Sequence, residues 1–517
     1  MNRNEMIKNL ESTEEWDLII IGGGATGLGS AVDAASRGYK TLLLEAHDFA
    51  KGTSSRSTKL IHGGLRYLKQ GNINLVTEAL KERGLLYKNA PHLIGHREFL
   101  VPNYQWWEGP FYGIGLKVYD LLAGELGIAK SKSLSKEETL AKIPSLEQED
   151  LRGGTIYFDG QFDDSRLAIT LARTCADHNG TLINYMPVTG MLKDGGTISG
   201  VEAVCSLTGK KHQIKAKGVI NACGIFSDEI RRMDEKKAEK RILTSQGSHI
   251  ILDRSFMKSS TAIMVPHTDD GRVLFIVPWK NHLVVGTTDL NIDEPVLEPK
   301  PFEEEIEFLL EHAGKYLIKD PKREDVLSAF SGIRPLVKTS SDQDSSKVSR
   351  DHLIFASDSK LLTICGGKWT TFRKMAEDVI DKAIALFKLV ERPCTTESLK
   401  LHGYLEGVHE IDSWCVYGSD AKEMTRLMKD SPHSNEPMHQ DLTYLPVEVI
   451  WAVKHEMAIH LEDVLARRTR ALFLNARASI EIAEKVARMM AKELGHGEDW
   501  ILQETKAFKK LAENYLL

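Results

Sequence analysis

A glycine-rich turn near the start of the chain could hold a phosphate-bearing cofactor. Residues 21–45 read IGGGATGLGSAVDAASRGYKTLLLE, and Gly22, Gly24 and Gly27 form a GxGxxG pattern. Glycines at this spacing permit a tight turn, close approach of the backbone to a pyrophosphate, and close packing of a helix on a sheet. Glu45 ends the next apolar run, where an acid accepts hydrogen bonds from ribose hydroxyls. The pattern predicts a dinucleotide site; a tight turn without a ligand is the alternative.

A loop rich in hydroxyl and cationic side chains follows this unit. Residues 52–68 read GTSSRSTKLIHGGLRYL, which fits neither a helical nor a strand period. The run is too basic for an ordinary surface turn. Because it begins just after the dinucleotide pattern, we interpret it as part of the same site, the alternative being a surface loop.

Apolar runs and helix signals give the elements that must carry these residues. Residues 17–22, DLIIIG, predict a buried parallel strand, followed by a helix over 25–37 and a second strand, TLLLE. Between 245 and 300 the alternating runs SHIILD, RVLFIVPW and HLVVGTTD predict an antiparallel sheet. Residues 361–386 return to a strand, a glycine turn and a helix, and the chain is mostly helical after about 395. Two distant glycine-rich turns, INACG and CGGKWT, favour FAD over NAD as the dinucleotide.

Bulk properties exclude several classes of protein. The chain has 517 residues and a net charge of -6, which does not suggest a nucleic-acid partner. Six cysteines without a CxxC pair fit a reducing compartment rather than a disulfide framework. We expect no metal: HEMAIH at 455–460 has one residue too many between its histidines for two ligands on one helix face. No run of about 18 apolar residues exists, so we expect no spanning helix, and we expect no signal or transit peptide.

Several stretches, taken together, resemble one enzyme family. They are IIIGGGATG, TSSRSTKLIHGGLRYL, QGSHIIL, VPWKNHLVVGTTD, FSGIRPL, VSRDH and GGKWTTFRKMAE, within residues 17–385. They are similar to the FAD-dependent glycerol-3-phosphate dehydrogenases, and LEDVLARRTRALFL, from 461, resembles part of that family's C-terminal domain. Many flavoproteins share GxGxxG, but SSxSTKLIHGGLRYL followed by SGIRPL and GGKWTT is specific to this family. The resemblance implies FAD as the cofactor.

The resemblance places the cofactor along the glycine-rich turns and the hydroxyl-rich loop. Hydroxyls of the loop, with Thr58 among them, would bond cofactor oxygens, and its glycine pair would let the backbone approach the flavin. The cofactor-binding candidates are Gly22, Gly24, Thr26, Gly27, Glu45, Thr53, Ser54, Ser55, Ser57, Lys59, Leu60, His62, Gly63, Gly64, Ala222, Gly224, Gly367, Lys368, Thr370 and Thr371.

The implied substrate, sn-glycerol 3-phosphate, carries a dianionic phosphate and a C2 hydroxyl. The substrate-binding candidates by motif position are Arg66, Tyr67, His249, Arg350 and Lys368; arginine suits phosphate through its bidentate fork. Arg334 in FSGIRPL matches the family's arginine beside the developing alkoxide. His249 is the side chain best suited to take the hydroxyl proton. The neighbourhood of Arg334, or water, stays open as the base.

The expected fold is α/β with added helices. It combines a Rossmann-like FAD-binding domain, an antiparallel-sheet substrate domain, as in amine and D-amino-acid oxidases, and a helical C-terminal domain. The FAD-binding domain is expected in three segments, 1–95, 151–245 and 331–390, the last closing the active site. A substrate-domain or helical insertion is expected at 96–150, the antiparallel substrate-binding domain at 246–330, and the C-terminal domain at 391–517.

We therefore expect an FAD-dependent glycerol-3-phosphate dehydrogenase that yields dihydroxyacetone phosphate and passes electrons to a membrane quinone. The alternatives are an oxygen-reducing glycerol-3-phosphate oxidase, an amine or amino-acid oxidase, and a flavin-stabilised binding protein. The oligomeric state, a homodimer included, is open.

Since quinones are confined to the bilayer, we expect a cytoplasmic enzyme attached peripherally to the cytoplasmic face of the inner membrane. The candidate membrane surfaces are the aromatic stretch 106–126 and the basic residues Arg467, Arg468 and Arg470. The alternative is that the aromatics are core and the arginines form internal salt bridges.

Overall fold

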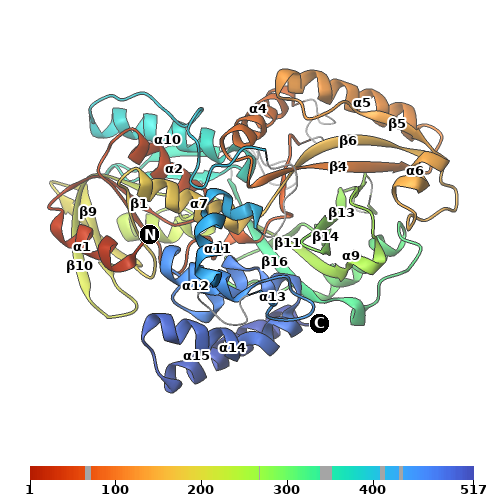
Figure 1. Cartoon of the computed structure of the whole chain (residues 1–517). Coiled ribbons are helices and arrows are strands. Elements are labelled where there is room, and N and C mark those ends of the chain that lie inside the picture. Colours follow the sequence, from red (N-terminus) through yellow and green to blue (C-terminus); the bar gives the residue numbers. More distant parts are fainter. Residues whose placement is uncertain (65–71, 267, 270, 338–351, 408–413, 430–434) are drawn as a thin grey trace.

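The computed structural model describes residues 1–64, 72–266, 268–269, 271–337, 352–407, 414–429 and 435–517. Within this part of the chain, two β-sheets lie beside each other, and a helical C-terminal domain packs beneath them (Figure 1). Arg66, Tyr67 and Arg350 lie outside the described residues.

The first sheet carries the predicted dinucleotide unit. Its central strand β1, WDLIII, pairs in parallel with β10 and β2 along its two edges. Its residues 18–21 are apolar and buried on both faces, as in a covered parallel sheet. The order is β17-β18-β10-β1-β2-β7, with the antiparallel pair β8 and β9 extending from β10. The strands are β1 Trp16–Ile21, β2 Thr41–Leu44, β7 Thr181–Ile183, β8 Val188–Asp194, β9 Thr197–Val204, β10 Lys211–Asn221, β17 His352–Ala356 and β18 Leu362–Gly366.

Helices cover the first sheet. Helix α2 (Ala25–Ser36) lies between α7 (Asp164–Asp177) and α10 (Phe372–Phe387), as Figure 1 shows. The inner side of α2 is built from small residues such as Ala31, Ala34 and Ala35, which lets the helix lie close to the strands. The other helices of this half are α1 Arg3–Ser12 and α8 Ser227–Asp234.

The second sheet is largely antiparallel and forms the other half of the molecule. Its order is β15-β11-β14-β13-β12-β4-β6-β3, with β16 pairing β11 and β5 pairing β6. The strands are β3 Leu60–Ile61, β4 Ile94–Asn103, β5 Lys132–Ser135, β6 Gly153–Phe162, β11 Ile242–Asp253, β12 Ala262–Val265, β13 Leu274–Trp279, β14 His282–Gly286, β15 Leu290–Ile292 and β16 Ser328–Val337. The helices beside it are α4 Ile73–Asn89, α5 Glu108–Ala123, α6 Lys136–Lys142 and α9 Glu303–Gly314.

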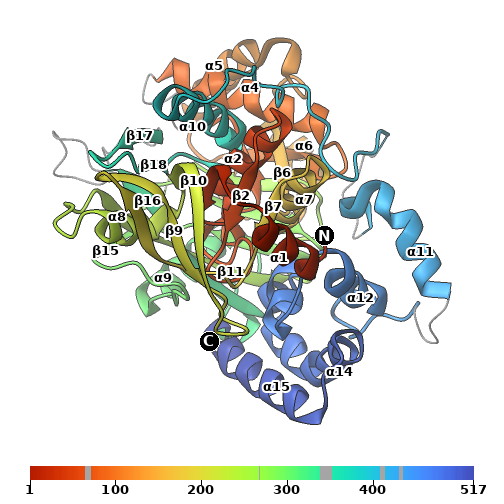
Figure 2. The ribbon, with the colours of Figure 1, turned by 90° about the vertical axis from the view of Figure 1, so that its left-hand side faces the viewer.

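The C-terminal domain is helical, as predicted. Asn475 begins its longest helix, since the Asn475 side chain accepts a hydrogen bond from the N–H of Ala478. The apolar face of that helix packs against α12 and α15. In Figure 2, α14 and α15 form the lower edge of the molecule, and α12 lies above them. The helices are α11 Ala421–Lys429, α12 Pro446–His455, α13 Ala471–Leu474, α14 Ala476–Leu494 and α15 Glu498–Ala512, with a π-helical turn at Asp463–Arg468.

The strands do not follow the expected domain segments everywhere. Strand β6 lies in segment 151–245, expected for FAD binding, yet it pairs with β4 in the second sheet. The last residues of β16 lie in segment 331–390 and pair with β11. The chain crosses between the sheets more often than hydrophobic periodicity indicated, because a strand's period says nothing about which sheet it joins.

The two candidate membrane surfaces differ in their exposure to solvent. Arg467, Arg468 and Arg470 are buried, so the prediction that they contact a membrane is wrong; they form internal ion pairs. Most of the aromatic stretch forms α5, and Trp106 just before this helix (77%) and Leu121 on it (80%) are exposed to solvent. In the part of the chain that the structure describes, no helix is both long and apolar enough to cross a bilayer.

Candidate active site

A cavity of about 680 Å³ lies between the two sheets. The first sheet contributes the segments that follow the carboxyl ends of the parallel strands β1, β2, β10 and β18. The second contributes residues of β11 and β16, and the loop 52–62 lines the wall between them. Open parallel sheets bind their ligands at the carboxyl ends of their strands, so this is the expected edge for a cofactor.

The glycine turn is as tight as the sequence predicts. Gly22 has φ +108°, and a Cβ there would lie 2.7 Å from the carbonyl oxygen of Ala222. A Cβ on Gly27 would lie 1.8 Å from the carbonyl oxygen of Gly22. Only glycine permits the strand and helix to meet this closely. The N-terminus of α2 therefore borders the cavity, where its N–H groups and dipole favour an anion.

Glu45 lines the cavity where β2 ends. Its carboxylate accepts hydrogen bonds from the backbone N–H of Gly23 and, at 2.8 Å, from that of His47. Burial raises the pKa of Glu45. The two hydrogen bonds fix the carboxylate over the glycine turn, in the position where the sequence pattern places a ribose.

The hydroxyl-rich loop joins the three parts of the cavity wall. The Ser54 hydroxyl accepts a hydrogen bond from the N–H of Ala25 at 2.9 Å and so caps α2. The Thr53 hydroxyl donates to the carbonyl of Ile333 on β16. The indole N–H of Trp369 donates to the carbonyl of Ser54 at 2.9 Å, which attaches the GGKWT turn to the loop. The loop thus sets the distance between the α2 terminus and the second sheet.

His249 reaches the cavity from the second sheet. Its Nε2 lies 2.9 Å from the Thr58 hydroxyl, and its ring stacks on Phe330 at 4.8 Å. Burial, reinforced by the nearby charges of Lys59 and Arg334, holds the pKa of His249 well below its usual value. The imidazole is therefore neutral at neutral pH and able to accept a proton, and its Nδ1 has no hydrogen-bond partner within the described residues.

Arg334 shares a face of the sheet with His249. Arg334 on β16 is paired with Ser245 on β11, and residues 245, 247 and 249 point to the same side of that strand. The guanidinium donates to the Thr287 hydroxyl and the Thr288 carbonyl, both at 3.1 Å. A Cβ on Gly247 would lie 2.3 Å from the guanidinium, so this glycine leaves the space that the cation fills.

Comparison with known proteins identifies the family. Residues 17–373 match the family of FAD dependent oxidoreductases, and residues 414–500 match the C-terminal domain of alpha-glycerophosphate oxidase. Mitochondrial glycerol-3-phosphate dehydrogenase of Homo sapiens is 39% identical over 97% of this chain and 74% of its own length. That of Mesocricetus auratus is 38% identical over 100% of this chain and 75% of its own. The chain belongs to the FAD-dependent glycerol-3-phosphate dehydrogenase family.

Solved structures agree with this membership. The X-ray structure of glycerol-3-phosphate dehydrogenase from Bacillus halodurans, complexed with FAD, matches with a TM-score of 0.81 at 30% identity, covering 99% of this chain and 97% of that one. Glycine oxidase from Geobacillus kaustophilus, with a TM-score of 0.55 at 19% identity, covers 75% of this chain and 99% of its own and shares the fold alone. The predicted family, the fold class and FAD as the cofactor are confirmed.

The cavity fits the cofactor of this family. Its volume of about 680 Å³ lies within the roughly 300–1,000 Å³ typical of ligand sites. The α2 terminus and the glycine turn suit a pyrophosphate, Glu45 suits a ribose, and the GGKWT turn contributes Gly367 and Lys368 to the wall beside the loop. The other candidates that line the cavity are Gly24, Thr26, Ser57, Leu60, His62, Ala222, Gly224 and Thr370.

Six of the predicted cofactor residues do not line the cavity, and one of them is Gly27 of the glycine turn. The Lys59 ammonium turns away to Asp164 at 2.6 Å and to the Ser55 carbonyl at 2.8 Å, because three aromatic rings and this carboxylate enclose it. The Ser55 hydroxyl donates to the carbonyl of Gly52 at 3.4 Å. The others are Gly63, whose N–H donates to the Tyr119 hydroxyl, Gly64, and Thr371, whose hydroxyl donates to the Lys368 carbonyl.

The sequence analysis did not predict the residues that position the site side chains from outside the cavity. Asp164 is fully buried and accepts hydrogen bonds from Lys59 and, at 2.7 Å, from the Ser57 hydroxyl. Thr287 and Asp289 position the Arg334 guanidinium. The signal for the second pair was in the quoted stretch VPWKNHLVVGTTD, whose polar end follows a buried strand. Asp164 gave no such signal, because an acid at the start of a helix also reads as an N-terminal charge.

Proposed function

We propose that this protein oxidises sn-glycerol 3-phosphate to dihydroxyacetone phosphate with FAD as the hydride acceptor, and passes the electrons to a membrane quinone. The observation that carries the proposal is the position of His249 and Arg334 on one face of paired strands, at the wall of a cavity built for a dinucleotide. A neutral base and a fixed cation are the two groups that oxidation of an alcohol requires.

The residues of this chain have separate tasks in the reaction. Bound FAD supplies a two-electron acceptor for the hydride that leaves C2. His249 takes the proton of the C2 hydroxyl, which its lowered pKa permits at neutral pH. Arg334 stabilises the negative charge that grows on that oxygen as the carbonyl forms. Lys368 on the cavity wall, together with Arg66, Tyr67 and Arg350, binds the phosphate.

Flavin bleaching tests the substrate. The purified protein, mixed without oxygen with sn-glycerol 3-phosphate, should lose its yellow flavin absorbance within seconds. Glycerol, glycine and proline, added at the same concentration, should leave the absorbance unchanged. Bleaching by an amino acid in place of glycerol 3-phosphate would overturn the proposal in favour of an amino-acid oxidase.

The role of Arg334 has its own test. Removing one donor that faces a developing oxyanion costs about 10²–10³ in rate, so Arg334→Ala should slow anaerobic flavin reduction by that factor at saturating substrate. Arg152→Ala, an exposed arginine of the loop before β6, is the matched control and should leave the rate unchanged. Wild-type flavin reduction by Arg334→Ala would remove Arg334 from the mechanism.

The electron acceptor and the location form the last part of the proposal. Quinones lie in the bilayer, so the protein would attach peripherally to the cytoplasmic face of the inner membrane through the exposed apolar face of α5. Lys117, Lys130 and Lys132, exposed beside that face, would favour anionic lipid. Reduced enzyme should reoxidise rapidly with a ubiquinone analogue and slowly with oxygen. The reverse order would favour the oxygen-reducing oxidase.

A further inference from the structure

One wall of the FAD cavity contacts the C-terminal domain. The loop after β2 lines the cavity with Glu45, Ala46, His47, Ala50 and Lys51, and the side chains between them face the other way. Asp48, in the middle of this loop, is fully buried, and its carboxylate lies among arginines of the π-helical turn Asp463–Arg468. Ion pairs between residues about 420 positions apart in sequence therefore join the cofactor wall to the C-terminal domain.

The π-helical turn brings two neighbouring arginines to one carboxylate. Arg468 contacts Asp48 through both terminal nitrogens, at 2.6 and 2.9 Å, and Arg467 donates to Asp48 through Nε. Consecutive residues of an α-helix point in directions about 100° apart. Here the N–H of Thr469 donates to the carbonyl of Val464, five residues back, at 2.9 Å, and the widened turn lets both guanidiniums converge. Such local π-turns are frequent at functional sites.

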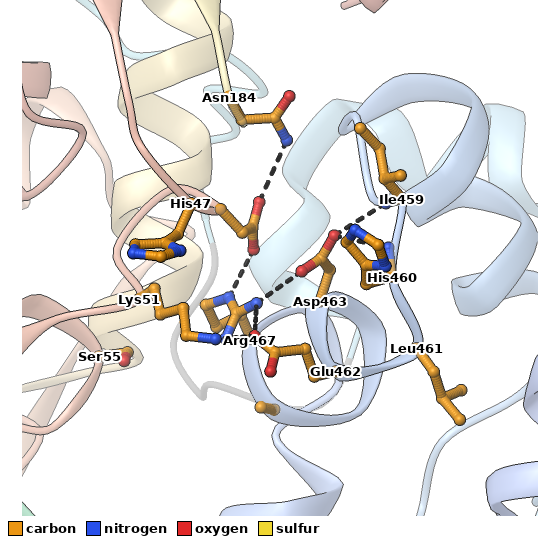
Figure 3. A network of polar contacts seen from close by, with 12 residues as sticks. His47, Lys51, Ser55, Asn184, Ile459, His460, Leu461, Glu462, Asp463 and Arg467 are labelled. Atoms are coloured by element: carbon orange, nitrogen blue, oxygen red, sulfur yellow. Dashed lines mark hydrogen bonds and ion pairs between the residues drawn. The ribbon is translucent and has the colours of Figure 1, made fainter. Parts of the chain in front are cut away.

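A second contact reaches the cavity wall directly. Lys51, which lines the cavity, donates from Nζ to Glu462 at 2.6 Å, and Arg467 donates to the same carboxylate at 2.9 Å, as Figure 3 shows. Burial opposes the charge of Glu462, but Arg467 and Lys51 lower its pKa to about 2, so it is ionised at neutral pH. Glu462 itself does not line the cavity. It is a link between the C-terminal domain and a wall residue.

The rest of the cluster holds these groups in place. Asp463 accepts hydrogen bonds from the backbone N–H of Ile459 and His460 at 2.8 and 2.9 Å (Figure 3). It also accepts one from the Tyr185 hydroxyl at 2.6 Å. Arg467 also donates to Asp463 at 2.6 Å. Every charged side chain of the cluster has a partner of opposite charge, which is what keeps such charges tolerable in a protein interior.

We propose that the C-terminal domain is part of the FAD-binding apparatus: Glu462, through Lys51, and Arg467 with Arg468, through Asp48, position the β2 loop that forms the cofactor wall. The C-terminal domain then sets the affinity for FAD without touching it. The positioning residues are Asp48, Glu462, Arg467 and Arg468, which do not line the cavity. The proposal rests on FAD binding and not on the identity of the substrate.

The test removes one link and measures the cofactor. Glu462→Gln keeps the size of the side chain and removes the charge that holds Lys51. We expect the dissociation constant for FAD, measured by fluorescence quenching on titrating flavin-free protein, to rise about tenfold. At saturating FAD, kcat should stay within about twofold, since the loaded wall has the native geometry. Glu462→Asp keeps the charge but moves it away from Lys51. Its dissociation constant for FAD should lie between those of wild type and Glu462→Gln.

A matched control separates positioning from general stability. Asp420 pairs with Arg173 of α7, so it also joins the C-terminal part of the chain to the first half, but neither residue lines the cavity. Asp420→Asn should lower the unfolding temperature and leave FAD affinity within about twofold of wild type.

Three results would overturn the proposal. The first is an FAD affinity of Glu462→Gln equal to that of wild type. The second is a rise in the FAD dissociation constant of Asp420→Asn as large as that of Glu462→Gln. The third is a loss of kcat in Glu462→Gln at saturating FAD. If Glu462→Gln does not fold, the affinity of Glu462→Asp decides by the same criteria. Failure of the wild-type protein to oxidise glycerol 3-phosphate would refute the proposed function and leave the affinity comparison standing.

Discussion

Two regions of this molecule reverse the usual placement of polar and apolar residues. The face of α5 exposes Phe111, Ile114 and Leu121 to solvent, while the turn of the C-terminal domain buries Arg467 and Arg468 among carboxylates. Both regions were predicted from sequence as membrane contacts, one because it is aromatic and the other because it is basic. The structure keeps the first and excludes the second. The composition of a stretch shows only that its residue types are unusual. The residues that contact the stretch decide whether its side chains are exposed or buried.

The partners explain the difference. The arginines are neutralised by Asp48, Glu456, Glu462 and Asp463, of which Asp48 lies on a different domain. No described residue covers the exposed face of α5 in the same way, since Ile114 stays 67% exposed and Leu121 80% exposed. An uncovered apolar face is available for contact with an apolar surface outside the chain, whereas the charges of the two arginines are already matched within the chain.

The largest effect should come from breaking the buried cluster. Asp48→Ala leaves two buried guanidiniums without their shared carboxylate, and removing one partner of a buried ion pair costs about 3–5 kcal/mol. The free energy of unfolding in urea should fall by that amount. Glu484→Ala removes the partner of Arg488 in an exposed pair and should cost less than about 1 kcal/mol. Equal losses in both variants would show that burial does not distinguish these pairs.

The pH dependence of stability should follow the same cluster. The folded-state pKa of Glu462 is lowered to about 2 from 4.5, by Arg467 and Lys51 against the effect of burial. A lowered carboxyl pKa stabilises the fold above the unfolded value, and the stability is lost as pH falls from 4.5 toward 2. At 1.36 kcal/mol per unit the full loss is about 3 kcal/mol.

Unfolding in urea between pH 6 and pH 3 measures this dependence. Glu462→Gln should give a flatter curve than wild type, because the variant has no proton to take up at this position. Burial raises the pKa of Asp463, which faces the same arginines, so Asp463 contributes a slope of the opposite sign, with stability rising as pH falls. That contribution is present in both proteins, and the difference between the two curves reports Glu462. Parallel curves for the two proteins would place the acid sensitivity elsewhere in the chain.

The exposed face of α5 should matter for membrane binding and not for folding. Leu121→Glu places a charge where a side chain would enter the bilayer, and we expect binding to vesicles of phosphatidylethanolamine and phosphatidylglycerol to weaken about tenfold, or 1.4 kcal/mol. Leu502→Glu is the control, since Leu502 is 64% exposed on α15, in a different region. It should bind vesicles like wild type. Sedimentation with vesicles measures both, and equal losses would mean that α5 is not the contact.

The aromatic composition of residues 106–126 did not predict which side of α5 is buried. Tyr112, Leu116 and Tyr119 recur at helical spacing and are buried, and Phe111, Ile114 and Val118 recur at the same spacing and are exposed. Because both faces are apolar, the sequence alone could not say which one meets the core. The fold class and the glycine turn were predictable, since β1, α2 and β2 follow from local pattern and turn chemistry.

The candidate site residues also divide into those that line the cavity and those that do not. His249, Arg334 and Lys368 do line the cavity, where motif position placed them. Lys59 does not, because the contacts that decide its direction, with Asp164 and the ring of Phe473, come from residues more than 100 and 400 positions away. The roles of Arg66, Tyr67 and Arg350 stay predictions. Local chemistry is readable from local sequence, but side-chain direction depends on tertiary neighbours.

The smallest effect should come from the fourth arginine of the basic stretch. Arg477, at the start of α14, is exposed, and its guanidinium donates to the carbonyl of Val326 at 3.2 Å. A single hydrogen bond of this kind contributes about 0.5–1.5 kcal/mol net, and exposure leaves water to replace it, so Arg477→Ala should lie at the lower end. Urea unfolding of this variant beside Asp48→Ala compares an exposed arginine of the stretch 467–477 with the buried arginines of the same stretch, which Asp48→Ala deprives of their carboxylate. If Arg477→Ala costs as much as Asp48→Ala, the stretch 467–477 acts as one unit. The small cost that we expect would mean that burial behind the cofactor wall, and not the basic composition of the stretch, makes its arginines matter.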